Sequence, residues 1–565
     1  MRMSADGALW RLVALLVLAV CSRGAAVAEW GHHGMVAADH KLASQAGAAI
    51  LEEGGNAVDA AVATAFAVCV VNPASCGIGG GGFMLIYLAQ EHRTVALDYR
   101  EVAPAAASRD MFVRSGQAVP ELSRRGGLAI AVPGEVAGLA VAQKVYGTLP
   151  LAVVMEPAIR YARDGFAIAP HLAKEIADNA EMMRGDPLLA RVFLRRDGSP
   201  RGKGEIVVQA ELARTLQRIA KEGPDAFYKG DIATAIVERV RAAGGILTEQ
   251  DLANYKPEWR QPISARYLDY DVVSMPPPSS GGGALLEALG ILGDDNLRSL
   301  GRATPTASHL LAETMKHVFA DRAKYYGDPG FVDVPLQRLL SPANTAALRK
   351  RISSTRTFEA SAYGSSPSAA ANPDDHGTSH LSVMDSRGNA VACTTTINTA
   401  FGSMVAVADS GIMLNNEMDD FAAQPGAPNV YGLVGADANA IAPGKRPLSS
   451  MTPTIVTRDG RPVLAVGGSG GPLIISNTLQ VLLNVLAYHM DATKAVAAPR
   501  LHHQWTPSVL FVEPAFPKAT QKALARNGHI VREMPSMAAI QAVRRDGDLF
   551  EGAADPRKGG EAVGW

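Results

Sequence analysis

The hydrophobic residues of the chain gather in runs that predict its first elements. Ala57 to Val71 is nearly all apolar, with Asp59 as its single charge, which predicts a helix buried on every side. Phe83 to Leu88 is a short continuous apolar run, typical of a buried strand. The glycines between residues 77 and 82 fit G-x-G-x-x-G. A dinucleotide site needs strand, glycines and helix in that order, whereas the order here is helix, glycines, strand, so the pattern argues against a nucleotide.

Helical spacing dominates the next part of the chain. Residues 140–260 carry Leu, Ala and Ile at three- and four-residue spacing, which predicts mostly helix. Tyr267 to Val273 is typical of a short strand, and a Pro-rich turn then leads into a helix for which Ser279 or Ser280 is a suitable N-cap. More helices are expected to about residue 350. Residues 353–375 are rich in Ser, Ala, Pro and Asp with almost no apolar pattern, so we expect a surface linker.

Two strand-like runs follow this linker and predict a β-hairpin. They run from Gly377 to Asp385 and from Ala390 to Asn398, with a Gly-Asn turn between them. Alternation groups polar side chains on one face of each strand: Thr378, His380 and Ser382 on the first, and Thr394, Thr396 and Asn398 on the second. A three-residue loop then sets Thr378 opposite Asn398, with Thr396 diagonal to it. We therefore expect a polar cluster at the open end of the hairpin.

Thr378 has a chemical use that follows from its position. A threonine hydroxyl is a poor nucleophile without a nearby base. If the chain is cut between Gly377 and Thr378, the new α-amino group becomes that base, because its unperturbed pKa of about 7.7–8.0 leaves a useful unprotonated fraction near neutral pH. Before the cut, the Thr378 hydroxyl can attack the Gly377 carbonyl, giving an ester that water opens. An ordinary hairpin after a surface loop is the alternative that these residues leave open.

Composition narrows the class of protein. The 565 residues include 54 Lys+Arg and 55 Asp+Glu, and 47% are hydrophobic, which indicates a folded protein without the basic surface of a nucleic-acid binder. Length alone allows three or four domains. The 4 cysteines argue against a disulfide scaffold, and Cys69 and Cys76 are open to pairing or to simple core packing. No metal-binding spacing such as His-Glu-x-x-His is present, so we expect no metal and no cofactor.

Residues 1–28 are typical of a secretory signal peptide. Arg2 and Arg11 give a positive start, Leu12 to Val20 is an unbroken apolar run, and Ala26-Val27-Ala28 is an A-x-A cleavage site. The apolar run is too short for a membrane span, which needs about 20 residues. We therefore expect Glu29 to begin a mature protein that is periplasmic or secreted and not stably inserted in a membrane. An uncleaved N-terminal anchor is the alternative.

A serine-hydrolase pattern competes for the catalytic role. Gly467 to Gly471 fits G-x-S-x-G around Ser469, with a strand pattern at 462–466 and a helix pattern at 474–486. Asp491 and one of His502, His503 or His529 supply the chain order Ser, Asp, His. No His-Gly-Gly-Gly-type segment is present, and a serine triad leaves the Thr378 hairpin unexplained.

Segments in order along the chain resemble the gamma-glutamyltransferase family of N-terminal-nucleophile hydrolases. The most specific are Asp98-Tyr99-Arg100-Glu101, Gly377-Thr378-Ser379-His380, Asn415 to Phe421, and Arg446-Pro447-Leu448-Ser449-Ser450-Met451. The resemblance extends from Gly34 to Ala554-Asp555-Pro556-Arg557. It implies a mixed α/β (α+β) fold, a four-layer αββα sandwich formed jointly by two subunits cut from one precursor. These would be a large subunit of residues 29–377 and a small catalytic subunit of residues 378–565.

The resemblance also implies a role for each matching residue. Thr378 is the expected nucleophile and Thr396 the residue that orients it, while Gly470 and Gly471 are the expected oxyanion hole. The expected α-carboxylate binders are Arg100, Ser449 and Ser450, and the expected α-amino binders are Asn398, Glu417 and Asp420. Residues 425–435 resemble a lid loop present in some members, in which Tyr431 would close over bound substrate. A γ-glutamyl group suits such a site, because it carries a carboxylate and an ammonium at one end and the scissile amide at the other.

The implied activity is transfer of a γ-glutamyl group from glutathione or a related amide, through an ester on Thr378, to water or to the amine of an amino acid or dipeptide. Glu417 stands where some relatives have Gln, and Ser379 where many have Thr, and neither change removes a role. A related subgroup hydrolyses glutaryl amides of β-lactams, including cephalosporins, whose acyl group lacks the α-amine, so Arg100 and Asp420 together favour γ-glutamyl. A secreted amino-acid-binding protein that uses the same two charges without chemistry is the non-enzymatic alternative.

Overall fold

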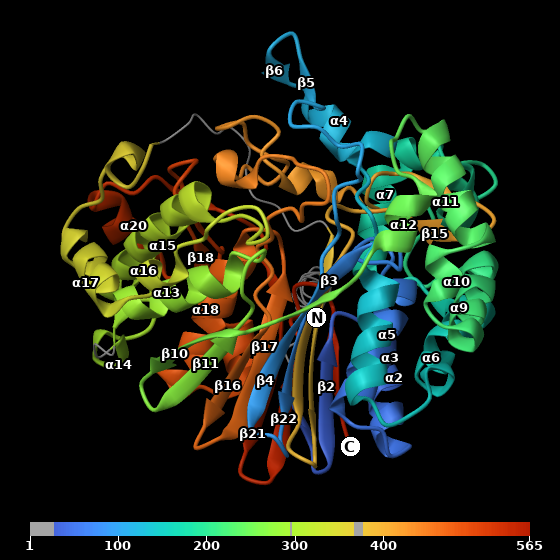
Figure 1. Ribbon diagram of the computed structural model, residues 1–565. Coiled ribbons are helices and arrows are strands. Elements are labelled where there is room, and N and C mark those ends of the chain that lie inside the picture. Colours follow the sequence, from blue (N-terminus) through green and yellow to red (C-terminus); the bar gives the residue numbers. More distant parts are fainter. Residues whose placement is uncertain (1–27, 294–296, 366–376) are drawn as a thin grey trace, which may run out of the picture.

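The computed structural model describes residues 28–293, 297–365 and 377–565. Two seven-stranded sheets stack face to face, and helices cover the outer face of each (Figure 1). The predicted four-layer αββα sandwich is therefore confirmed. The signal-peptide prediction falls on residues 1–28, of which 1–27 lie outside the described residues.

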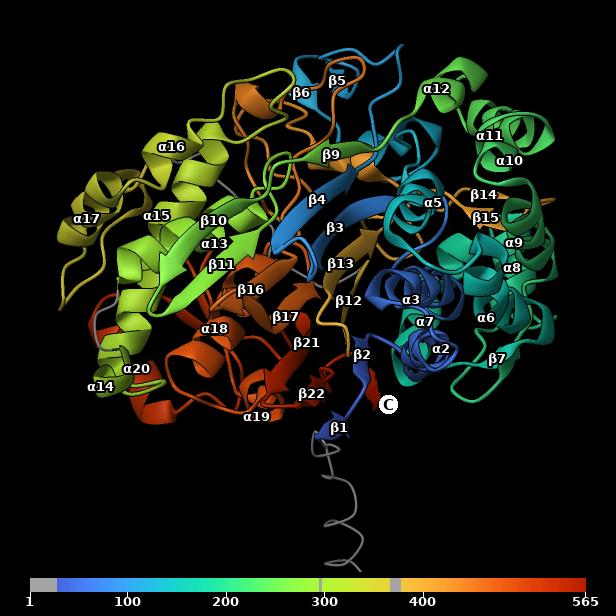
Figure 2. The ribbon, with the colours of Figure 1, turned by 60° about the horizontal axis from the view of Figure 1, so that its bottom comes forward.

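Each sheet contains strands from both sides of Gly377. The first has the order β1 (Glu29–Gly31), β22 (Leu549–Ala553), β21 (Ala539–Asp546), β17 (Arg461–Ser469), β16 (Thr454–Arg458), β11 (Tyr270–Ser274) and β10 (Ile263–Tyr267). The second has the order β23 (Glu561–Gly564), β2 (Gly34–Ala38), β12 (Thr378–Asp385), β13 (Ala390–Thr396), β3 (Gly81–Leu88), β4 (Arg93–Tyr99) and β9 (Glu258–Arg260). Figure 2 shows the two sheets between their helical layers.

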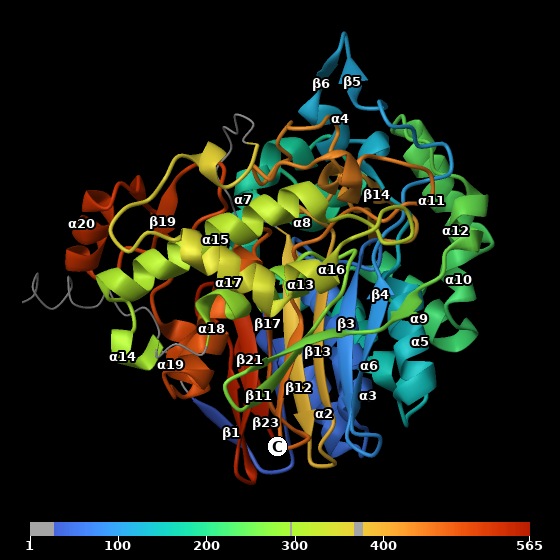
Figure 3. The same cartoon turned by 60° about the vertical axis from the view of Figure 1, so that its left-hand side comes forward.

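Separate groups of helices cover the two sheets. The first sheet is covered by α13 (Gly281–Leu292), α18 (Leu473–Leu486) and α19 (Ala492–Ala497), and α15 (Pro305–Tyr325) packs on α13. Figure 3 brings this side forward, with α17 (Pro342–Arg351) and α20 (Lys518–Arg526). The second sheet is covered by α2 (Lys41–Glu52), α3 (Ala57–Val71) and α5 (Glu135–Tyr146), and α6 (Leu151–Asp164) packs on α3. Farther out are α7 (Pro170–Met183), α8 (Pro187–Phe193), α9 (Ala210–Glu222), α10 (Asp225–Tyr228), α11 (Asp231–Ala242) and α12 (Glu249–Asn254), so the prediction of mostly helix over 140–260 is confirmed.

The alternation of side chains along β12 fixes where Thr378 lies. Leu381 and Val383 pack into the core beneath the helices, whereas Met384 belongs to the core between the sheets. Because successive side chains of a strand point to opposite faces, Thr378 shares the inter-sheet face of β12 with Met384. Thr378 therefore lies at the end of a strand, between the two sheets.

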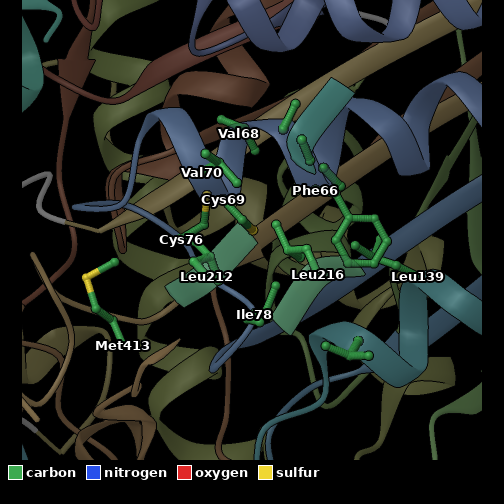
Figure 4. Close-up of a cluster of buried hydrophobic side chains, with 14 of the residues drawn as sticks. Phe66, Val68, Cys69, Val70, Cys76, Ile78, Leu139, Leu212, Leu216 and Met413 are labelled. Carbon is green, nitrogen blue, oxygen red and sulfur yellow. The ribbon is translucent and has the colours of Figure 1, made fainter. Parts of the chain in front are cut away.

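Helix α3 confirms the predicted buried helix with the same bounds, Ala57–Val71. Its N-cap, Asn56, forms a reciprocal capping box with Asp59, which explains the single charge in the apolar run. Figure 4 shows Phe66 and Cys69 of this helix packed with Leu216 of α9. The three cysteines of the described chain, Cys69, Cys76 and Cys393, are free and buried.

Two local predictions need correction, and a third is refined. The strand expected at Tyr267–Val273 is a hairpin of β10 and β11, because Leu268 adopts a left-handed φ of 53° and reverses the chain. Ser280 precedes α13, but its hydroxyl donates to the Ser449 carbonyl instead of capping the helix. The segment expected as a surface linker lies at the surface over residues 353–365, and it is anchored there because Thr357 and Tyr363 donate to Glu313 of α15. Residues 366–376 lie outside the described part.

Candidate active site

The β12–β13 hairpin forms as predicted, but its register differs. Thr378 lies opposite Thr396, not opposite Asn398. The turn closes one residue earlier than expected, between Asp385 and Asn389, because the Asp385 carboxylate accepts hydrogen bonds from the backbone and side-chain amides of Asn389. The two threonine hydroxyls are therefore direct cross-strand neighbours.

A short chain of hydrogen bonds connects these hydroxyls with the Gly377 carbonyl. Oγ1 of Thr396 donates to the Gly377 oxygen at 2.8 Å and accepts from the backbone N–H of Asn398 at 2.8 Å. Oγ1 of Thr378 lies 3.1 Å from Oγ1 of Thr396. Since the one hydroxyl proton of Thr396 is used on Gly377, Thr378 is the donor in this pair. The arrangement holds the Thr378 oxygen beside the carbonyl that it is expected to attack.

The predicted oxyanion glycines form the turn between β17 and α18. Gly470 and Gly471 have φ values of 133° and 53°, which side-chain-bearing residues rarely adopt. A Cβ on Gly471 would also lie 2.7 Å from Cδ1 of Tyr431. The turn stands at the N-terminus of α18, where backbone N–H groups and the helix dipole favour negative charge.

The strand-turn-helix context of Ser469 is present, but its triad is not assembled. Oγ of Ser469 accepts from Lys558 at 3.1 Å. Asp491 caps α19 and pairs with Lys494, and His502 contacts Ser476 and Gln504. Within the described residues these groups face other partners, which argues against the serine-hydrolase alternative.

Arg100 lies at the centre of a buried group of carboxylates. Its guanidinium pairs with Glu417 and with Asp420 (2.5 Å), and Glu101 lies 3.6 Å away. Burial raises the pKa of Asp420 and Glu417 above the usual range, and Arg100 opposes both shifts. Burial likewise raises the pKa of Glu101, to about 8. Residues predicted to bind opposite ends of a zwitterion thus pair with each other in the ligand-free site.

Two serines and a buried arginine form the adjoining wall. Ser449 and Ser450 line the site, and the Ser450 oxygen accepts from Nη2 of Arg322 at 3.3 Å. Nε of Arg322 donates to Ser280 at 3.0 Å. Burial lowers the pKa of Arg322 to about 10, and the charge of Asp420 partly offsets this effect. No sequence signal distinguished Arg322, which lies within a long helix far from the matching segments.

The loop of residues 425–435 covers the site. Tyr431 is buried, its ring lies against Gly471, and its hydroxyl donates to the Asn398 carbonyl at 2.5 Å. Asn429 of the same loop donates to Asp420 at 3.1 Å. Asn398 directs its amide N–H to the Asn416 carbonyl, so its amide oxygen is the atom suited to accept from an ammonium.

Residues of these elements line one narrow pocket. Ten of the twelve predicted site residues line it, and Gly377 and Gly470 adjoin the lining residues in the chain. The ten are Arg100, Thr378, Thr396, Asn398, Glu417, Asp420, Tyr431, Ser449, Ser450 and Gly471.

Arg446 connects two of the segments that resemble the family, Asp98–Glu101 and Arg446–Met451. It lies 3.2 Å from Asp98 and donates to the Arg100 carbonyl at 3.2 Å. The backbone that carries Arg100 is thereby fixed from the segment that carries Ser449 and Ser450. The sequence pointed to both segments but not to this contact.

A four-layer sandwich with a threonine at the first residue of a central strand defines the class of N-terminal-nucleophile hydrolases, and solved structures place the fold there. The cephalosporin acylase of Bacillus halodurans matches with a TM-score of 0.83 and 31% identity, over 95% of this chain and 97% of that chain. The gamma-glutamyltranspeptidase of Helicobacter pylori matches with a TM-score of 0.55 and 40% identity, over 56% of this chain and 91% of that chain.

Within this class, the chain belongs to the gamma-glutamyltranspeptidase family, whose model matches residues 43–565. The glutathione hydrolase proenzyme of Escherichia coli is 44% identical over 527 residues, which covers 93% of this chain and 90% of that protein. Among the described residues, no helix combines the length and apolar character that a membrane span requires.

Proposed function

We propose that this protein is a γ-glutamyltransferase that hydrolyses glutathione and related γ-glutamyl amides after cutting its own chain before Thr378. The observation that carries the proposal is a single pocket in which a positioned threonine hydroxyl adjoins a buried arginine-carboxylate group. Membership of the gamma-glutamyltranspeptidase family and the likeness to a glutathione hydrolase proenzyme support it.

Self-cleavage would begin with attack of Oγ1 of Thr378 on the Gly377 carbonyl carbon. Thr396 already donates to the carbonyl oxygen, so it can stabilise the negative charge that develops there. The hydroxyl proton passes to the nitrogen as the C–N bond between the two residues breaks, which leaves a free amine and an ester that water hydrolyses. The products would be a large subunit of residues 29–377 and a small subunit of residues 378–565, which share both sheets and so stay together.

The released α-amine of Thr378 would then serve as the base in turnover. It accepts the hydroxyl proton as Oγ1 attacks the γ-carbonyl of the donor, and the amide N–H groups at Gly470 and Gly471 are suited to the oxyanion. The amine product leaves with the proton, and a γ-glutamyl ester remains on Thr378. Water, or the amine of an amino acid or dipeptide, would complete the cycle.

The charges of the pocket suit a zwitterionic donor. The α-carboxylate would take one side of the Arg100 guanidinium, and the α-ammonium would pair with the carboxylates that Arg100 partly releases. The zwitterion adds one positive and one negative charge, so the net charge of the buried group is unchanged. A donor without the ammonium would leave a carboxylate unpaired, which costs affinity.

The signal-peptide pattern predicted at residues 1–28 supports export of the enzyme to the periplasm or the medium. The proposal includes no metal, organic cofactor or nucleic-acid partner. Its partners are γ-glutamyl donors, amine acceptors and the two subunits themselves.

An acylase for glutaryl amides is the second candidate, because the Bacillus halodurans cephalosporin acylase shares the fold over 95% of this chain. Turnover of γ-glutamyl-p-nitroanilide and glutaryl-p-nitroanilide separates the two. We expect the γ-glutamyl compound to be strongly preferred, and glutathione to give glutamate, with γ-glutamyl-dipeptide added when glycylglycine is present. Preference for the glutaryl compound would contradict the proposal, and an uncut chain without turnover would favour a binding protein.

A further inference from the structure

A buried lysine contacts the backbone of the candidate nucleophile from behind. Lys558 lies in the loop between β22 and β23, and its side chain is 2% exposed. Its ammonium donates to the carbonyl oxygen of Thr378 and, at 3.1 Å, to Oγ of Ser469. Ser469 directly precedes Gly470 and Gly471, so one side chain connects the nucleophile with the turn that is suited to the oxyanion.

The loop that carries Lys558 is fixed by buried charges. Asp555 pairs with Arg500 at 2.7 Å and with Arg557 at 3.0 Å, and its backbone N–H donates to the side chain of Gln541. These contacts give a structural reason for the Ala554–Arg557 segment, to which the sequence assigned no role. They hold the chain so that Lys558 reaches the end of β12.

Asp39, which directly follows β2, lies beside this lysine. Its Oδ2 lies 3.4 Å from Nζ of Lys558, and its Oδ1 accepts from Gln541 at 2.6 Å. Burial raises the pKa of Asp39, and Lys558 opposes the shift.

We propose that Lys558 is a positioning residue that fixes Thr378 against the Gly470–Gly471 turn and whose positive charge keeps the α-amine of mature Thr378 in its basic, unprotonated form. The inference rests on the proposed function. The nitrogen and carbonyl oxygen of one residue are at most about 3.6 Å apart, so Nζ lies within about 7 Å of the amine. At that distance the positive charge of Lys558 lowers the pKa of the amine, because it disfavours a second positive charge nearby.

The other charged groups around Thr378 do not supply this effect. On the pocket side, Arg100 is paired with carboxylates. On β12 itself, His380 is neutral near pH 7, because burial lowers its pKa to about 3. On the loop, Asp555 and Arg557 are paired with each other. Among the described residues, Lys558 is the charged side chain with a hydrogen bond to the Thr378 backbone.

The test uses Lys558→Met, which keeps the length of the side chain, and Lys558→Arg, which keeps its charge. Lys494→Met is the control, since Lys494 is exposed and pairs with Asp491 at the surface. A denaturing gel follows self-cleavage of the full chain, and the pH dependence of kcat/KM with γ-glutamyl-p-nitroanilide follows the base. An uncut, inactive wild-type chain would refute the proposed function itself, before any variant is compared.

We expect Lys558→Met to cut itself at least tenfold more slowly, and its acid limb of kcat/KM to move up by about one pH unit. Lys558→Arg and the control Lys494→Met should both be cut, and in both the acid limb of kcat/KM should stay at the wild-type pH. The proposal is wrong if Lys558→Met is cut and keeps the wild-type limb, if Lys558→Arg moves the limb as Met does, or if neither variant is cut. If Lys558→Arg is cut and Lys558→Met is not, the acid limb of Lys558→Arg decides. An unchanged limb supports the proposal, and a shifted limb contradicts it.

Discussion

At the scale of single residues, the site depends on groups that each make several directional contacts. The Thr396 hydroxyl donates to the Gly377 carbonyl and accepts hydrogen bonds from the Thr378 hydroxyl and the Asn398 backbone N–H. Arg100 likewise contacts two carboxylates and a backbone carbonyl. Conservative changes at these two positions should therefore have measurable effects on chemistry.

Removal of the Thr396 hydroxyl should slow self-cleavage. Thr396→Val keeps the shape of the side chain but loses the donor to Gly377, and one such donor is worth roughly 10²–10³ in rate. We expect a comparable loss in the rate at which purified precursor is cut, measured on denaturing gels over time. Thr396→Ser, which retains the hydroxyl, should stay within about tenfold of wild type. Equal rates for Val and wild type would contradict this role.

Asp420 should discriminate between acyl groups. Asp420→Asn keeps the size of the side chain but loses the charge that would meet the donor ammonium. We expect kcat/KM for γ-glutamyl-p-nitroanilide to fall about 10- to 100-fold, and the ratio of glutaryl to γ-glutamyl turnover to rise. Asp437→Asn is a suitable control, because Asp437 pairs with Arg109 at the surface. An equal loss for both substrates would indicate general damage instead of recognition.

At the scale of elements, the segment that precedes the cleavage site is attached to α15 by a buried polar cluster. Glu313 lies 3.1 Å from Nζ of Lys316 and accepts from Thr357 and Tyr363. His309 of the same helix contacts the Ser353 carbonyl at 2.7 Å. The cluster thereby fixes the position at which residues 353–363 leave the helical layer.

Loss of Glu313 should destabilise this attachment. In Glu313→Ala the buried Lys316 loses its carboxylate partner, and breaking a buried pair in this way costs about 3–5 kcal/mol of unfolding free energy. Urea unfolding measures the loss, and limited proteolysis should cut within 353–365 earlier than in wild type. The double variant Glu313→Leu/Lys316→Met, which has no unpaired charge, should recover part of the stability. No recovery would contradict the charge argument.

The local sequence pattern predicted the elements that neighbouring residues specify, and it failed where particular side-chain contacts, some between distant residues, decide the structure. Helix 57–71 has the predicted bounds because an apolar run, Asn56 and Asp59 all specify it locally. The register of the hairpin could not be predicted, since it depends on side-chain bonds of Asp385 within the turn. The family resemblance supplied most pocket residues. Lys558 and Arg322 carried no signal, because their contacts join positions far apart in the sequence.

At the scale of the whole molecule, buried ionisable groups of both kinds act on stability. Burial lowers the pKa of His380 and His529 to about 3 and raises the pKa of Glu101 and Glu135 to about 8. The two sets have opposite consequences for the pH dependence of unfolding.

Whether stability rises or falls with pH depends on which state, folded or unfolded, binds more protons. Below about pH 6.5 the unfolded chain protonates histidines that the fold keeps neutral, so stability falls as the pH drops from 6.5 toward 3. The fold keeps Glu101 and Glu135 protonated, whereas the unfolded chain releases those protons above about pH 4.5, so their contribution falls as the pH rises to 8. His40, His317 and His502, each with a pKa of about 4, add to the first set.

We therefore expect the histidines to lower the urea midpoint as the pH falls below 6.5, and Glu101 and Glu135 to lower it as the pH rises toward 8. Urea unfolding from pH 4 to pH 9 measures this dependence. His380→Asn should weaken the loss on the acid side, where its own proton no longer contributes. A midpoint that rises steadily from pH 7 to pH 4 would contradict the assignment of neutral histidines.

The central claim is that Thr378 cuts the chain before itself and then acts as the nucleophile. Intact-mass measurement of the purified wild-type, Thr378→Ala and Ser469→Ala proteins tests it most directly. The account predicts two polypeptides in wild type and in Ser469→Ala, one ending at Gly377 and one beginning at Thr378, and a single uncut chain in Thr378→Ala. A cut Thr378→Ala chain, or an uncut chain only in Ser469→Ala, would contradict it.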